Sequence, residues 1–265
     1  MAHSEYLNVG GETMLLGHFI SEQIAHAASA AANRVIHDTT AYPLPDCGLL
    51  IGLCGLPGVG KDTAFANLPG AIRASFADTL RREVLGAWPG LTAEMLSDRT
   101  LKETPTDVLQ IRNCSEPSFV AYSGDVLSSK SPRQIMQEWG SWRRRVYGEG
   151  YFVNRTMAEI EKVRRGSLIV ITDVRYQNEF DAVRSAGGGV VWLVRQDGMA
   201  GAATHESDVF SANPVDGLTV AMPALTTDVY KRALVDIVRL AARSADKATA
   251  ERTLSPMPDR SSETK

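Results

Sequence analysis

Cysteine is scarce in this chain of 265 residues, and long apolar runs are absent. Its cysteines, Cys47, Cys54 and Cys114, are odd in number and include no C-x-x-C pair, which argues against a disulfide framework or a zinc site. No apolar run approaches the roughly 18–20 residues of a membrane span, and the N-terminus lacks a secretory signal pattern. We therefore expect a protein of a reducing cytoplasm that makes no contact with a membrane.

The charge of the chain is nearly balanced. It has 28 basic and 31 acidic residues, a formal net charge of -3, so nothing indicates bulk attraction to nucleic acid. A pocket with a few local arginines could still bind an anionic small molecule. The length and the content of 44% hydrophobic and 22% charged residues are those of a globular protein large enough for one α/β domain.

Short apolar runs alternate with helical patterns through most of the sequence. Residues 49–54, 167–172 and 189–194 are typical of buried parallel strands, and shorter strand candidates lie at 71–76 and 218–222. Helical patterns occupy 61–68, 78–87, 132–147, 152–164, 178–186 and 226–243. This alternation predicts a three-layer α/β fold, with a mostly parallel sheet of about five strands and helices on both faces.

The two ends of the chain differ from this central pattern. Residues 1–12 look loose, and 13–37 show the periodicity of one helix. Residues 244–265 are charged, rich in Ser and Thr, and predicted to be disordered. The sequence therefore divides into an N-terminal extension with one helix at 1–46, a central domain at 47–243 and a disordered tail at 244–265.

A glycine-rich segment follows the strand at 49–54. It reads Gly-Leu-Pro-Gly-Val-Gly-Lys-Asp-Thr over residues 55–63 and matches G-x-x-x-x-G-K. Glycines let the backbone N–H groups turn toward phosphate oxygens, and the helix that follows adds its positive end. We therefore expect a P-loop that binds a nucleoside triphosphate, formed by Gly55, Pro57, Gly58, Val59, Gly60, Lys61, Asp62 and Thr63. The alternative is an ordinary strand–turn–helix that contains Gly-Lys by chance.

The residue after Lys61 departs from the usual loop. Asp62 stands where a hydroxyl residue normally supports Mg²⁺, and the hydroxyl comes one place later, at Thr63, as in the G-K-G-T of adenylate-kinase-like enzymes. Lys61 would reach the β- and γ-phosphates. Whether Thr63 contacts Mg²⁺ directly or through water stays open.

A carboxylate ends the apolar run at 167–172. Asp173 lies at the carboxyl end of a buried strand, where open α/β sheets bind ligands and where an acidic residue commonly supports Mg²⁺. Arg175 follows it and could neutralise phosphate. The alternatives are that Asp173 caps a helix and that Arg175 pairs with Asp173 or Glu179.

Arginines cluster on two predicted helices: Arg81 and Arg82 on one, and Arg133, Arg143, Arg144 and Arg145 on the other. Phosphoryl transfer needs such cations to bind an acceptor phosphate and to spread charge in the transition state. Arg133 and Gln137 are four residues apart and share one helical face, and Arg144 lies two turns further along it. A solvated basic surface is the alternative.

Several segments, in order, carry a family resemblance. Besides the G-K-D-T of the loop, Ser75–Arg81 is similar to S-F-A-D-x-L-K, Arg133–Arg145 to R-x-L-L-Q-x-x-G-T-x-x-x-R, Thr172–Glu179 to T-D-V-R-F-P-N-E, and His205–Asp208 to H-x-S-E. Over residues 49–243 the chain thus resembles the deoxynucleoside monophosphate kinases of bacteriophages, within the P-loop nucleoside monophosphate kinases. Departures at Ser141, Trp142, Gln177 and Asp208 bear mainly on acceptor specificity.

The resemblance implies a P-loop fold and ATP-dependent phosphorylation of a (deoxy)nucleoside monophosphate to the diphosphate, with Mg²⁺, for nucleotide supply in DNA synthesis. It implies Lys61, Asp173, Arg175 and Arg195 as catalytic residues, Thr63 and Asp173 as supports for Mg²⁺, and Asp78, Arg81, Arg133, Gln137, Arg144 and Arg145 as the acceptor site. The accepted base and sugar, a homodimer and the role of residues 1–46 stay open. The alternatives are a kinase of another phosphorylated metabolite, such as dephospho-coenzyme A, and a nucleotide-binding protein without turnover.

Overall fold

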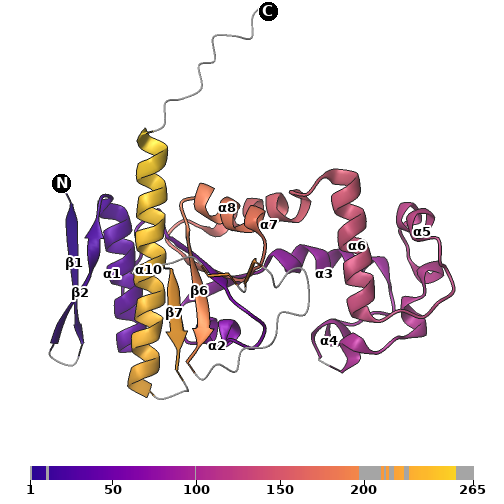
Figure 1. Ribbon diagram of the computed structural model, residues 1–265, viewed down its shortest axis with the longest axis horizontal. Coiled ribbons are helices and arrows are strands. Elements are labelled where there is room, and N and C mark those ends of the chain that lie inside the picture. Colours follow the sequence, from indigo (N-terminus) through magenta and orange to yellow (C-terminus); the bar gives the residue numbers. More distant parts are fainter. Residues whose placement is uncertain are drawn as a thin grey trace, which may run out of the picture. The chain divides into compact units, whose positions relative to one another are not determined.

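The computed structural model describes residues 2–9, 12–98, 100–196, 210–211, 213–214, 218–223 and 227–254. The chain forms two compact units (Figure 1). The first unit combines Met1–Ala74 with Ile160–Lys265, and the second is Ser75–Glu159. No helix in the described ranges is both long and apolar enough to cross a membrane.

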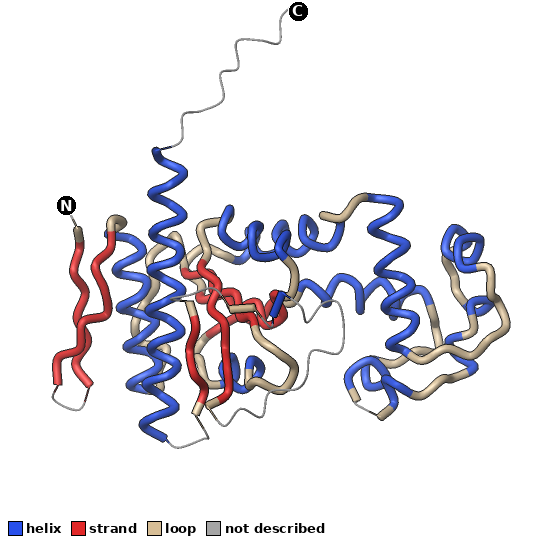
Figure 2. The backbone as a smooth tube through the Cα atoms, viewed as in Figure 1, coloured by secondary structure: helices blue, strands red, loops and turns tan. Residues whose placement is uncertain are grey.

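A five-stranded parallel sheet lies at the centre of the first unit (Figure 2). Its strands are β3 (Leu49–Cys54), β4 (Ala71–Ala74), β5 (Leu168–Val174), β6 (Gly189–Arg195) and β7 (Thr219–Met222), in the order β4-β5-β3-β6-β7. The predicted three-layer α/β fold is therefore confirmed. Because the strands are parallel, their carboxyl ends meet at one edge, where residues 55–63 and 175 follow β3 and β5.

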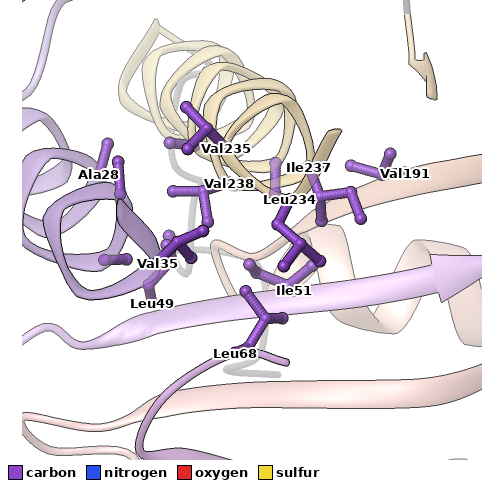
Figure 3. Close-up of a cluster of buried hydrophobic side chains, with 14 of the residues drawn as sticks. Ala28, Val35, Leu49, Ile51, Leu68, Val191, Leu234, Val235, Ile237 and Val238 are labelled. Atoms are coloured by element: carbon purple, nitrogen blue, oxygen red, sulfur yellow. The ribbon is translucent and has the colours of Figure 1, made fainter. Parts of the chain in front are cut away.

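Both faces of β3 are buried. On one face Leu49, Ile51 and Leu53 belong to the core that includes α1 (Glu22–His37) and α10 (Thr227–Leu254), as Figure 3 shows for Leu49 and Ile51 beside α10. On the other face Gly52 lies close to Val183 of α8 (Gln177–Ser185). The continuous apolar run of β3 follows from this double burial.

The N-terminus forms a hairpin, so the prediction that residues 1–12 are loose is wrong. Strands β1 (His3–Val9) and β2 (Glu12–Phe19) pair antiparallel, and α1 begins at Glu22 rather than at residue 13. Leu7, Leu16 and Phe19 are buried in the core with α1 and α10. The apolar spacing of residues 16–24 fitted a helix, but β2 alternates its side chains between two faces and Ser21 caps α1.

The C-terminal helix is also longer than predicted. α10 continues to Leu254, so residues 244–254 are helical and the prediction of a disordered tail from 244 is wrong for them; residues 255–265 lie outside the described ranges. Asp246 is only 5% exposed, and its carboxylate accepts hydrogen bonds from the N–H groups of Ile20 at 2.7 Å and Ser21 at 2.8 Å. The carboxylate thereby binds the backbone where α1 begins, as Figure 1 shows α1 and α10 side by side.

The second unit is helical. It contains α3 (Phe76–Ala87), α4 (Ala93–Ser97), three short 3₁₀ helices (Leu101–Glu103, Asp107–Leu109 and Ile111–Asn113), α5 (Pro117–Ser123), α6 (Pro132–Tyr147) and most of α7 (Tyr151–Val163). Its core is built around Trp88, Phe119, Trp139 and Trp142, whose rings meet mainly edge to face. Ser131 caps α6 in a capping box with Gln134, and Pro132 takes the first helical position, which explains why α6 begins where the sequence predicts.

We expect a chain that ends at Arg243 to melt at a lower temperature than the full chain. The truncation removes Asp246 and with it two hydrogen bonds from the N–H groups of Ile20 and Ser21, and a hydrogen bond to a charged group contributes about 1.5–3 kcal/mol. Thermal melting followed by circular dichroism measures the loss, and a chain ending at Leu254 is the control that keeps α10. Equal melting temperatures for both truncations would contradict this role of residues 244–254.

Candidate functional site

Three glycines shape the loop between β3 and α2 (Lys61–Ala66). Gly55 has a φ of 136°, and a Cβ atom there would lie 2.5 Å from the carbonyl oxygen of Leu193 on β6. Gly58 and Gly60 also have positive φ values, 79° and 101°, although a Cβ atom at either would meet no neighbour within 4 Å. The loop therefore needs glycine at 55 for close packing and at 58 and 60 for backbone conformation.

Lys61 lies beneath this loop rather than in solvent. It is 9% exposed, and its Nζ donates hydrogen bonds to the carbonyl oxygens of Gly55 at 2.5 Å and Leu56 at 3.0 Å. Burial, together with the charge of Arg175, lowers the pKa of Lys61 to about 8, although the charge of Asp173 acts in the opposite direction. The ammonium group is thus held at the end of the glycine-rich segment by neutral carbonyl groups.

The carboxyl end of β5 brings a carboxylate to the same edge of the sheet. Gly52 pairs with Ile171 and Cys54 with Val174, so β5 has one more residue than β3 in this interval, and Asp173 lies within the irregularity. Asp173 is half-buried, and its charge acts on both Lys61 and Glu179. The structure therefore brings Lys61, Asp173 and Arg175 into electrostatic contact.

Glu179 is the residue of this region that sequence reasoning missed. It is 8% exposed, and its Oε2 accepts hydrogen bonds from the backbone N–H groups of Arg175 at 2.7 Å and Tyr176 at 3.2 Å. Burial, together with the charge of Asp173, raises the pKa of Glu179 to about 8. The sequence could have indicated this role, because Glu179 lies in the first turn of α8, where a glutamate commonly accepts hydrogen bonds from the free N–H groups at the helix start.

The other predicted residues of the first unit are more exposed. Asp62 and Thr63 lie exposed in the first turn of α2, and Arg195 ends β6 with an exposed side chain. The segment His205–Asp208 lies outside the described residues.

The predicted acceptor residues belong to the second unit. Asp78 and Arg81 form an ion pair of 2.8 Å on α3, and Arg133 on α6 pairs with Glu103 at 2.6 Å. Further along α6, Gln137 is exposed, the guanidinium of Arg144 lies 5.6 Å from the ring centre of Phe152, and that of Arg145 lies 6.0 Å from that of Tyr122. Arg133 thus already has a carboxylate partner through its Nε, and a ligand would have to share the guanidinium with Glu103 or displace it.

The donor atoms at the sheet edge suit Mg²⁺ better than a transition metal. The carboxylate of Asp173 and the hydroxyl of Thr63 are hard oxygen ligands, and Mg²⁺ commonly binds one or two such groups together with water and substrate phosphates. Within the described ranges there is no group of three or more His, Cys, Asp or Glu residues that could hold a metal alone. A carboxylate and a hydroxyl supply two ligands, so an ion that they hold would take its remaining ligands from water or phosphate oxygens.

Comparisons with known proteins give one informative similarity. No family model matches the chain. A curated protein of Acanthamoeba polyphaga mimivirus, named "Putative deoxynucleotide monophosphate kinase", is 29% identical over 164 residues. The aligned region covers 61% of this chain and 81% of that protein.

We expect Glu179→Gln to change how stability depends on pH. The pKa of Glu179 rises from 4.5 to about 8 on folding, so its contribution to stability is complete below about 4.5 and is lost as the pH rises to about 8. Glutamine keeps an oxygen that can accept the two N–H groups and does not titrate. The free energy of unfolding of the unaltered chain should therefore fall relative to that of the variant across this window.

Urea unfolding at several pH values between about 5 and about 8 measures this difference. Glu161→Gln, which removes an exposed carboxylate on α7, is the matched control. A constant difference between Glu179→Gln and the unaltered chain across the window would show that Glu179 does not titrate there.

Proposed function

We propose that this chain is an ATP-dependent nucleotide kinase that transfers a phosphoryl group to a (deoxy)nucleoside monophosphate and releases ADP and the diphosphate. The observation that carries the proposal is the buried Lys61 at the end of the glycine-rich segment, beside Asp173 and Arg175. The similarity to the mimivirus protein supports a nucleotide kinase. Nucleotide supply for DNA synthesis, in a cytoplasm, is the role that this reaction would serve.

The first unit would bind the triphosphate. The first-turn N–H groups of α2 have no acceptor within their own helix and are available to phosphate oxygens. The ammonium of Lys61 would exchange the carbonyl oxygens of Gly55 and Leu56 for phosphate oxygens. Mg²⁺, held by Asp173 and Thr63 directly or through water, would supply positive charge to the phosphates.

The arginines at the edge of the sheet would stabilise charge in the transition state. Arg175 directly follows β5, and the hydrogen bond from its N–H to Glu179 fixes its backbone there. Arg195 ends β6, the other strand that pairs with β3. A general base is unnecessary because the acceptor phosphate is already an anionic nucleophile.

The second unit would bind the acceptor. A guanidinium can bind a monophosphate through two hydrogen bonds, and the amide of Gln137 can both donate to a base and accept from it. We assign Arg133, Gln137, Arg144 and Arg145 on α6 to this role, with Asp78 and Arg81 on α3. The ion pair of Arg133 with Glu103 joins side chains that are 47% and 52% exposed, and such surface pairs contribute only about 0–1 kcal/mol, so a phosphate can replace Glu103.

A screen for ADP release tests the proposed function. The purified chain is incubated with ATP, Mg²⁺ and each nucleoside monophosphate and deoxynucleoside monophosphate, with dephospho-coenzyme A as an additional acceptor. Release with a monophosphate supports the proposal, and release with dephospho-coenzyme A alone indicates a kinase of another metabolite. ATP binding without ADP release from any acceptor would indicate a binding protein and contradict the proposal.

We expect Lys61→Ala to reduce turnover by about 10²-fold or more while the chain stays folded, because a cation at the transferred phosphate stabilises the transition state. Coupled ADP release gives the rate, and thermal melting tests folding. Lys231→Ala is the matched control, since Lys231 also donates to a backbone carbonyl, that of Ile36 at 3.3 Å, but lies on α10. Similar rates for the two variants would contradict the role of Lys61.

We expect Arg133→Ala to raise KM for the monophosphate, or to lower kcat, with little change in KM for ATP, because it removes a contact to the acceptor alone. Gln137→Ala should shift the preference among bases. Steady-state kinetics with both substrates varied give these constants. Glu103→Ala, which frees Arg133 from its ion pair, should lower KM for the monophosphate, and unchanged constants in all of these variants would exclude α6 as the acceptor site.

A further inference from the structure

One carboxylate in the second unit binds side chains from two other helices. Glu83 lies on α3 and its side chain is 15% exposed. Its Oε2 accepts hydrogen bonds from Trp139 Nε1 and Arg143 Nε, both at 2.9 Å, and its Oε1 accepts one from the Tyr151 hydroxyl at 2.5 Å. Arg155 adds an ion pair at 3.7 Å. Both oxygens are thus engaged, Oε2 by α6 and Oε1 by α7.

The partners of Glu83 on α6 lie beside the proposed acceptor residues of that helix. Trp139 lies six positions after Arg133, and Arg143 lies six positions after Gln137. At about 100° per residue, each of these pairs lies about a third of a turn apart. Glu83 therefore binds α6 on a different face from the proposed acceptor residues and does not itself occupy that face.

The hydrogen bonds of Glu83 restrict rotation of α6 about its axis. Side-chain ends lie about 5–6 Å from a helix axis, so a rotation of about 10° moves them by about 1 Å. A displacement of about 1 Å at a reacting or binding group can reduce a rate on the order of 10²-fold. Apolar packing alone holds a helix less specifically than hydrogen bonds with fixed donors and acceptors do.

We propose that Glu83 is a positioning residue for the acceptor site: its carboxylate fixes the rotation of α6 and thereby the direction of Arg133, Gln137 and Arg144. The inference rests on the proposed function. It assigns to Glu83 a role in acceptor binding without contact between Glu83 and the acceptor.

The charge environment suits this role. Burial raises the pKa of Glu83, but hydrogen bonds from Tyr151, Trp139 and Arg143 outweigh it, and the pKa lies below its usual value. Burial and the bond to Glu83 raise the pKa of Tyr151 to about 12, so the phenol keeps its proton and donates. The guanidinium of Arg143 also lies over the rings of Trp142 at 4.3 Å and Trp139 at 5.0 Å. The network therefore keeps its charges and its donors at neutral pH.

Steady-state kinetics of Glu83→Ala and Glu83→Gln test the inference with the monophosphate that the unaltered chain accepts best. We expect Glu83→Ala to raise KM for the monophosphate or to lower kcat by about 10- to 10²-fold, and to leave KM for ATP within about twofold. Glu83→Gln should fall between, because its amide oxygen can still accept from Trp139 and Arg143. Tyr151→Phe removes a single donor and provides a milder variant if Glu83→Ala does not fold.

A double-mutant cycle separates positioning from general destabilisation. If Glu83 acts through the acceptor face, the effects of Glu83→Gln and Arg144→Ala on kcat/KM for the monophosphate should not add. Ile111→Ala is the control: it removes a fully buried apolar side chain of the same unit that makes no polar contact with Glu83. It should lower the melting temperature without changing KM for the monophosphate.

The outcomes distinguish the inference from the function on which it rests. If the unaltered chain releases no ADP with any monophosphate, the proposed function fails and the inference fails with it. If the unaltered chain is active and the Glu83 variants keep its constants for the monophosphate, only the inference is wrong. Equal changes in KM for ATP and for the monophosphate, as general loosening would give, also overturn it, and so does a fall in kcat that is no larger than the loss of folded protein seen in thermal melting.

Discussion

The position of β3 between β5 and β6 is the constraint on which the candidate site depends. Parallel pairing on both sides places the carboxyl ends of the three strands at one edge, so the glycine-rich segment follows β3 where Asp173 lies near the end of β5 and Arg195 ends β6. The chain can leave β3 toward α2 only because Gly55 lies against the carbonyl of Leu193 on β6. The sheet and the loop thus constrain each other, since a side chain at residue 55 would separate the loop from β6.

At this edge of the sheet, burial changes the pKa values of Lys61 and Glu179. The charged forms of Lys61 and Glu179 have opposite signs, yet burial shifts the pKa of each toward the uncharged form, to about 8 in both cases. A bound phosphate would add negative charge near Lys61, favour its ammonium form and raise its pKa. Under the proposed function, the buried lysine would therefore be more fully protonated in the nucleotide complex than in the free chain.

The second unit carries several arginines on one helix, α6, and these arginines differ in how their side chains are held. Arginine side chains are long and lose much conformational freedom when they are fixed. In α6 the exposed Arg133 has a carboxylate partner in Glu103, whereas Arg143 is bound by Glu83 and lies over aromatic rings. Under the proposed function, the paired and half-buried Arg143 anchors the helix, and the more exposed cations are those that a ligand can recruit.

The sequence alone determined the elements that depend on local patterns. The strands of the central sheet, the glycine-rich segment and the bounds of α6 follow from continuous apolar runs, from glycine and from a Ser131–Pro132 start, each of which acts within a few residues. The hairpin at the N-terminus was missed because its apolar spacing fits a short helix as well as a strand. The tertiary structure decided between them when β2 packed against α1 and α10.

Tertiary structure alone decided which charged residues are buried and what they bind. In the sequence, Asp246 is one of many charged residues in a polar segment. In the structure, its carboxylate accepts a hydrogen bond from the N–H group of Ser21, at the start of α1 and 225 residues away in the chain. In the sequence, Glu179 is only the last residue of a motif, and Glu83 is one acidic residue of an amphipathic helix. In the structure, each of them accepts hydrogen bonds from several groups. A carboxylate is stable in such places only when its partners are already assembled, and that assembly depends on contacts between segments that no local pattern encodes.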